Sequence, residues 1–93
     1  MLEGIRKIHL IGIGGSGMRA IANILIAKGY EVSGSDVAES PIIEKFRQMG
    51  ATIHIGHDAS YVDGVDAVVR STAIRESNPE LQAAREQGIT VLH

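Results

Sequence analysis

Apolar residues fall into five short runs along the chain, separated by segments of mixed polarity. The runs are rich in isoleucine and valine; the first is followed by glycines, and the next three end in aspartate, glycine and serine. Short apolar runs bounded by such residues are typical of buried β-strands. The predicted strands are residues 7–13, 30–36, 51–56, 65–71 and 89–93.

Three of the intervening segments predict helices. After the first strand, apolar residues recur at helical spacing until Lys28 and Gly29. Ser40 before Pro41, and Asn78 before Pro79, are typical of helix starts, because a polar cap and a proline suit the first turn. The buried stripe expected for the second helix is Ile42, Ile43, Phe46 and Met49.

Strands that alternate with helices at this spacing indicate parallel pairing through right-handed crossovers. We therefore predict a single α/β domain, residues 1–93, with a Rossmann-like, open, doubly wound sheet of five parallel strands and helices on both faces. A reversal of strand order beside the first strand is usual in this class.

Composition narrows the function classes. The 93 residues are 44% apolar, carry a net charge of −2, and include three aromatic residues and no cysteine. No apolar run approaches the roughly 20 residues that span a bilayer. The few aromatic residues do not form a stacking platform for single-stranded nucleic acid. We expect a cytoplasmic protein with no membrane or nucleic-acid partner.

The first strand runs into a glycine-rich loop. Gly12, Gly14 and Gly17 fit G-x-G-x-x-G, and Gly15 adds a fourth glycine. In this motif the first glycine permits a tight turn, the second lets a ligand approach the backbone, and the third brings helix and strand together. Free amides at the helix start, with the Ser16 hydroxyl, favour a pyrophosphate. The alternative is a turn that serves packing alone.

Two further residues follow strand ends at the same edge of the sheet. Asp36, 24 positions after Gly12, is placed to accept a hydrogen bond from a ribose hydroxyl. Its alternative role is a turn or cap aspartate. His57 directly follows Gly56 and is either a base or ribose contact or a solvated loop histidine. These residues indicate a nucleotide diphosphate without identifying it.

Other chemistry is not indicated. The chain has no G-x-x-x-x-G-K-[ST] loop for ATP and no nucleophile with a base and an orienting group. His54 and His57, three apart, have poor geometry for a metal, so no metal site is expected. His9 lies in an apolar run and is interpreted as a core or edge histidine. We therefore expect no catalytic residue and no cofactor in this chain.

Six ordered segments together resemble the amino-terminal domain of the Mur ligases. They are HLIGIGGSGM, GYEVSGSD, GATIHIGH, STAI, NPELQAA and GI. The resemblance implies a domain that binds the UDP end of a sugar nucleotide. In the parent enzyme it implies ATP-dependent amide formation between UDP-N-acetylmuramate and L-alanine through an acyl phosphate, with Mg²⁺, in bacterial peptidoglycan synthesis.

The resemblance also assigns site residues. It places the diphosphate against Gly14, Gly15, Ser16, Gly17, Met18, Ser71, Thr72 and Ala73. It places the uridine beside Ser35, Asp36, His57 and Ile74. Arg19 and Arg70 depart from the family pattern; either they reinforce a diphosphate site or they are neutral surface changes.

The resemblance covers only the first of three family domains. The central ATPase domain and the carboxy-terminal domain are expected to be absent, so the chain alone should not catalyse. One alternative is the same domain of a recycling ligase that joins a tripeptide to the same sugar nucleotide. Others are a regulatory NAD-binding module without catalysis and a scaffold with an empty turn.

Overall fold

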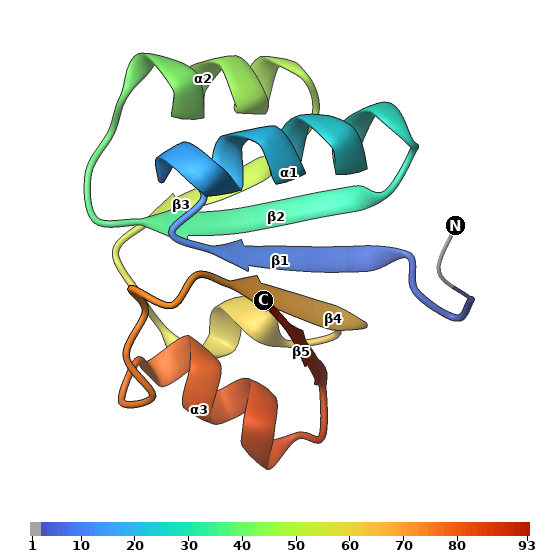
Figure 1. The fold of residues 1–93 in the computed structure, drawn as a ribbon, viewed down its shortest axis with the longest axis vertical. Coiled ribbons are helices and arrows are strands. Elements are labelled where there is room, and N and C mark those ends of the chain that lie inside the picture. The colour runs from blue at the N-terminus through green and yellow to red at the C-terminus, as the bar shows by residue number, and fades with distance from the viewer. Residues whose placement is uncertain (1–2) are drawn as a thin grey trace.

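A computed structural model describes residues 3–93 as one sheet with helices on both faces (Figure 1). The elements are β1 (Lys7–Ile11), α1 (Ser16–Ala27), β2 (Glu31–Asp36), α2 (Pro41–Gln48), β3 (Thr52–Ile55), the 3₁₀ helix η1 (Ala59–Val62), β4 (Ala67–Arg70), α3 (Pro79–Glu86) and β5 (Thr90–Leu92). All strand pairs are parallel, and the order is β3-β2-β1-β4-β5. The predicted fold is confirmed.

The strand order reverses beside β1. The chain passes from β1 to β2 and β3 on one side, then crosses to β4 and β5 on the other. Ile8 pairs with Val32 of β2 and with Ala67 of β4, so β1 is the central strand. Connections leave β1 and β4 in opposite directions, which opens a crevice at their carboxyl ends.

Alternation along the strands builds two apolar layers. Ile8 and Leu10 face α1 and α2, where Phe46 is fully buried. Ile11 packs on the other face in the cluster that includes Leu81 of α3 and Val62 of η1. The predicted caps are confirmed: Ser40 accepts from the amide of Ile43, and Asn78 accepts from that of Glu80.

The strands are one to three residues shorter than predicted, and two of the differences in boundaries have a clear local cause. β1 ends at Ile11 rather than at residue 13, because Gly12 turns the chain with φ +77° and its amide donates to Ser35 O. α2 ends at Gln48, so Met49 follows the last turn and is 40% exposed instead of buried.

Candidate functional site

A cavity of about 300 Å³ lies in the crevice between β1 and β4. It is lined by Gly12, Gly14, Gly15, Asp36, Ser71, Ala73 and Ile74. Three segments that are distant in the sequence therefore meet here: the glycine loop, the end of β2 and the segment after β4. All but Gly12 are among the predicted ligand contacts.

The end of β2 holds the glycine loop in place. The amides of Gly12 and Ile13 donate to Ser35 O at 2.8 and 3.0 Å. The amide of Gly14 donates to Asp36 Oδ2 at 2.8 Å. Three consecutive amides are thus fixed by two residues of the neighbouring strand, so the loop has a defined shape without ligand contacts.

The start of α1 leaves donors available. The first helical hydrogen bond runs from the Arg19 amide to Gly15 O, at 3.0 Å. The amides of Ser16, Gly17 and Met18 precede it in the first turn, where an α-helix supplies no acceptor. Because Ser16 and Gly17 are exposed, these amides and the helix dipole offer a site for an anion.

One part of the motif interpretation is wrong. We expected Gly17 to let helix and strand pack closely, yet a Cβ added at Gly17 would meet nothing within 4 Å. The close approach is at Gly14, where a Cβ would lie 2.8 Å from Asp36 Oδ2. Among the glycines of this loop, a Cβ would make its shortest contact at Gly14, which lines the cavity.

The Asp36 carboxylate accepts hydrogen bonds from two backbone amides. Its Oδ2 accepts from Gly14, and its Oδ1 accepts from its own neighbour Val37 at 2.7 Å. An ionised carboxylate has about four acceptor positions. Asp36 therefore acts as a cap for the loop and retains acceptor capacity toward the cavity that it lines.

The two arginines bind neighbouring backbone. Arg19 Nε donates to Gly14 O at 2.8 Å, across the glycine loop. Arg70 is only 7% exposed, and its guanidinium contacts Ser71 O, Ile74 O and Glu76. Neither predicted role for Arg70 includes this one: it fastens the segment that forms the second wall of the cavity.

Replacing Arg70 with methionine is expected to loosen residues 71–76, because the segment loses a buried donor that bonds two of its carbonyls. We expect a loss of about 1–2 kcal/mol in the free energy of unfolding and faster amide exchange over 72–76. Chemical denaturation and hydrogen exchange measure both. Arg75→Met removes an exposed arginine of the same segment and serves as control; equal exchange in the two variants would contradict this role.

Glu76 anchors this segment from the solvent side. It accepts from Arg70 and, at 2.9 Å, from Arg85 Nε of α3. Hydrogen bonds from Arg85 and Arg70 lower the pKa of Glu76 to about 2. The carboxylate therefore stays ionised over the pH range in which such domains are folded.

Two predicted uridine contacts lie outside the cavity lining. Ser35 is fully buried, and its hydroxyl donates to Glu80 Oε1 at 2.7 Å. His57, whose side chain is 22% exposed, bonds Glu80 Oε2 through Nδ1 at 2.5 Å. Thr72 is exposed in the segment after β4 but does not line the cavity.

Glu80 was not among the site residues predicted from the sequence. The helix dipole favours a glutamate in the first turn whether its side chain is exposed or buried. The position of Glu80 in the sequence therefore does not indicate that its side chain is buried. A signal was present elsewhere: His9, Ser33 and Ser35 are polar residues at same-face positions of neighbouring strands. Buried polar groups need partners, and Glu80 is that partner for His9 and Ser35.

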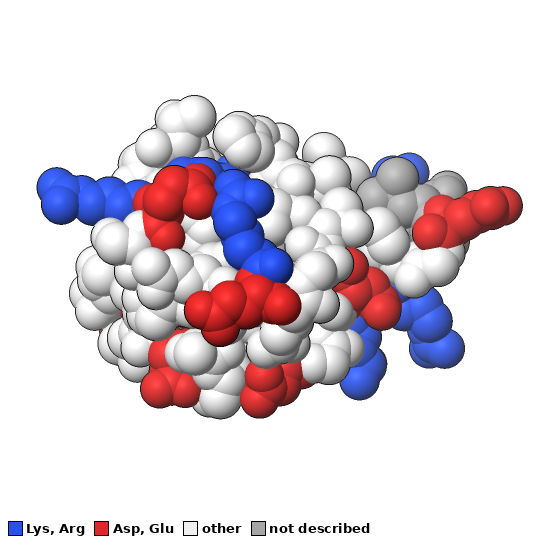
Figure 2. Space-filling view, turned by 90° about the horizontal axis from the view of Figure 1, so that it is seen from below, with Lys and Arg blue, Asp and Glu red and all other residues white. Residues whose placement is uncertain are grey.

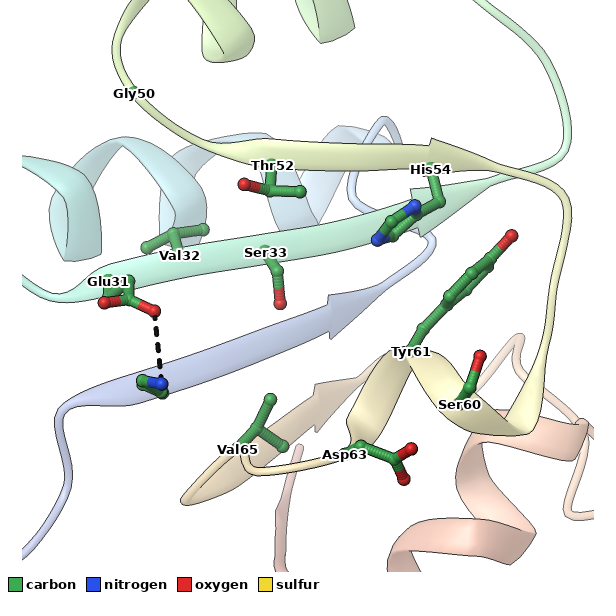
Figure 3. Close-up of a pocket in the computed structure, with 11 residues that line it drawn as sticks. Glu31, Val32, Ser33, Gly50, Thr52, His54, Ser60, Tyr61, Asp63 and Val65 are labelled. Carbon is green, nitrogen blue, oxygen red and sulfur yellow. Dashed lines mark ion pairs between the residues drawn. The ribbon is translucent and has the colours of Figure 1, made fainter.

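A larger cavity, of about 650 Å³, lies on the sheet face that η1 covers (Figure 3). Side chains of β1, β2 and β3 form one wall, and Tyr61 stacks on His54 with ring centroids 4.0 Å apart. Lys7 and Glu31 pair across its end at 3.7 Å. This cavity contains none of the predicted site residues.

Acidic and basic side chains are interspersed on the α3 side of the molecule, without a patch of one sign (Figure 2). Within residues 3–93, no helix has the length and apolarity needed to cross a membrane. In the same residues, no three His, Cys, Asp or Glu side chains are grouped as metal ligands.

Comparison with known proteins identifies relatives that match nearly the whole chain. A protein in Acidovorax sp. (strain JS42), named UDP-N-acetylmuramate--L-alanine ligase, is 51% identical over 92 residues, which are 99% of this chain and 19% of the relative. A Lawsonia intracellularis protein of the same name is 52% identical over 99% of this chain and 20% of its own. The chain thus spans about a fifth of the length of these relatives.

A solved structure gives the same picture. The UDP-N-acetylmuramate-alanine ligase MurC from Thermotoga maritima superposes with a TM-score of 0.87 at 35% identity, over 92% of this chain and 20% of that one. A family model described as "Mur ligase family, catalytic domain" matches residues 7–93. Because that match covers nearly all of the sequence, the chain belongs to the Mur ligase family.

Proposed function

We propose that this chain is the sugar-nucleotide-binding domain of an ATP-dependent ligase that adds L-alanine to UDP-N-acetylmuramate. The observation that carries the proposal is that the glycine loop and Asp36 line one cavity with Ser71, Ala73 and Ile74, at the strand-order reversal. The names of the relatives support the substrate and the reaction.

In the proposed binding mode the diphosphate bonds the free amides of Ser16, Gly17 and Met18 at the start of α1. The remaining acceptor capacity of Asp36 takes a ribose hydroxyl, and residues 71–74 close the opposite wall. Each of these groups is held by the fold rather than ordered by the ligand, which reduces the entropy lost on binding. The domain therefore acts by orienting the substrate.

The bond-forming chemistry belongs to the other proposed domains of the parent enzyme. ATP, when bound there with Mg²⁺, supplies the activation of the carboxyl group. Because ATP and nucleotide-activated sugars are found in the cytoplasm, we propose that the protein is cytoplasmic. This chain contributes recognition of the UDP-N-acetylmuramate end and no catalytic residue.

The test is thermal unfolding of the chain with UDP-N-acetylmuramate, UDP or NAD. A ligand that binds only the folded state, present at 100 times its Kd, adds about 2.7 kcal/mol. For a domain of this size that raises Tm by roughly 10 °C or more. We expect both uridine nucleotides to raise Tm and NAD to leave it unchanged. A rise with NAD and none with uridine nucleotides would identify the regulatory dinucleotide module instead.

A second candidate is the recycling ligase that joins a tripeptide to the same sugar nucleotide. The UDP-N-acetylmuramate:L-alanyl-gamma-D-glutamyl-meso-diaminopimelate ligase from Neisseria meningitides superposes with a TM-score of 0.85 at 28% identity, over 96% of this chain and 28% of that one. Both candidates share this domain's substrate. Assay of the parent enzyme with L-alanine and with the tripeptide separates them.

A further inference from the structure

Glu80 carries a buried carboxylate outside the proposed ligand cavity. Its side chain is fully buried at the start of α3 and is bonded by three side chains from three other parts of the fold. His9 Nε2 lies 2.6 Å from Oε1, the Ser35 hydroxyl donates to the same oxygen at 2.7 Å, and His57 Nδ1 lies 2.5 Å from Oε2. The carboxylate thus joins β1, β2, the segment after β3 and α3.

The contacts of this carboxylate favour its ionised form. Burial raises the pKa of the Glu80 carboxyl, but hydrogen bonds from His9, Ser35 and His57 together outweigh burial and hold this pKa below its ordinary value. The N-terminal end of α3 adds a favourable dipole. An ionised carboxylate has no proton to donate, so each of its partners must donate to it.

That requirement fixes the proton positions on both histidines. His9 must carry a hydrogen on Nε2, and His57 must carry one on Nδ1. The other ring nitrogen of His9 is occupied, because Nδ1 lies 2.8 Å from the Ser33 hydroxyl. Among residues 3–93, no side chain or backbone group hydrogen-bonds His57 Nε2.

His57 is therefore held through Nδ1, and its Nε2 is available for a ligand. The residue follows Gly56 at the carboxyl end of β3, and its side chain is 22% exposed. This is the edge of the sheet at which Asp36 ends β2, since Asp36 pairs with Ile55. His57 is thus at the edge of the sheet where the proposed nucleoside binds.

We propose that Glu80 is a positioning residue for nucleotide recognition: its carboxylate holds His57 through Nδ1, so that Nε2 is the ring nitrogen that hydrogen-bonds the uridine part of the ligand. The inference rests on the proposed function for the identity of the ligand. Glu80 does not touch the ligand itself. If the cluster had only a structural role, it would stabilise the fold, and any effect of Glu80 on UDP affinity would not depend on His57.

The proton positions are tested first, by ¹⁵N imidazole NMR of the chain. Wild type is expected to show a hydrogen on Nδ1 of His57 and on Nε2 of His9. A bare Nδ1 on His57 in wild type would overturn the proposal without recourse to any variant. Glu80→Gln keeps the shape of the side chain but replaces one carboxylate oxygen with an N–H₂ group. With the amide oxygen facing the donors His9 and Ser35, the N–H₂ group faces His57 Nδ1, so we expect the His57 hydrogen to move to Nε2.

The functional step is tested with UDP as the probe, by calorimetric titration of wild type, Glu80→Gln, His57→Ala and the double variant. We expect Glu80→Gln to weaken UDP binding about tenfold, as for loss of one well-made hydrogen bond. In the His57→Ala background the same change is expected to alter Kd by less than twofold. Equal losses in both backgrounds, or no loss in either, would overturn the proposal.

Glu86→Gln is the matched control, because Glu86 is an exposed carboxylate at the end of the same helix. It is expected to leave the His57 spectrum and the UDP affinity unchanged. Failure of the proposed function has a different signature. In that case wild type does not bind UDP although the expected proton positions are observed, and the nucleotide role of Glu80 is overturned with it.

Discussion

Replacing Gly14 with valine is expected to weaken UDP-N-acetylmuramate binding by about 100-fold or more, equivalent to about 2.7 kcal/mol. The Cβ of any side chain at this position would lie 2.8 Å from Asp36 Oδ2 and 3.5 Å from Ile43 Cδ1. Asp36 must then move, and the hydrogen bond from the Gly14 amide to Oδ2 is lost with it. The two methyl groups of valine also extend from a position that lines the 300 Å³ cavity.

Calorimetric titration measures the affinity, and chemical denaturation measures the accompanying loss of stability, which we expect to be about 1–3 kcal/mol for overpacking. Gly14→Ala separates the two causes, since it makes the contact with Asp36 without filling the cavity; we expect a smaller loss, of about tenfold. Asn23→Val, on the exposed face of α1, controls for a β-branched residue. Affinity of wild-type strength in Gly14→Val would show that the diphosphate does not approach this loop.

The sequence was sufficient to predict the parts of the fold that depend on local pattern. Strands, helices and the caps Ser40 and Asn78 follow from periodicity and from the residues that favour helix starts. The reversal of strand order beside β1 was expected only because it is usual in this fold class. The glycine loop and Asp36 were predicted to lie at one edge, and the structure brings them together with residues 71–74. Proximity of strand ends requires only the strand order.

Side-chain partners could not be predicted in the same way, because they depend on register and depth. Glu80 had an adequate local explanation as a first-turn glutamate, and only the three-dimensional packing reveals that His9 and Ser35 need it. Arg70 was expected either to reinforce the diphosphate site or to be a neutral surface change, whereas its guanidinium bonds the segment that follows β4. Glu80 bonds Ser35 beneath the glycine loop, and Arg70 bonds the backbone of the segment after β4.

The short segment Gly34–Asp36 shows how strand β2 shapes the glycine loop. Ser35 O accepts two loop amides, and the Asp36 carboxylate accepts a third. This arrangement depends on the pairing of Ile11 with Ser35 in the β1–β2 register. Gly34, for which the sequence predicted no role, leaves the space that Ile13 of the loop occupies.

The second large effect is accordingly expected at Gly34, which is buried in the middle of β2. A Cβ there would lie 2.8, 2.9 and 3.0 Å from Cδ1, Cβ and Cγ2 of Ile13. Ile13 is fully buried and its amide is bonded to Ser35 O, so it has no open space to enter. Gly34→Ala is expected to cost about 2–3 kcal/mol of unfolding free energy, a fall in Tm of roughly 10 °C or more.

Chemical denaturation of a double-mutant cycle tests the cause. Ile13→Ala removes the Cδ1 and Cγ2 atoms of the clash, so Gly34→Ala should cost at least about 1 kcal/mol less in that background. Gly17→Ala is the matched control, because its added Cβ meets no atom within 4 Å and alanine favours the helix. If Gly34→Ala were as stable as Gly17→Ala, Ile13 and the glycine loop would be able to move away from β2 at little cost. The hydrogen bonds from β2 would then not hold the loop rigidly.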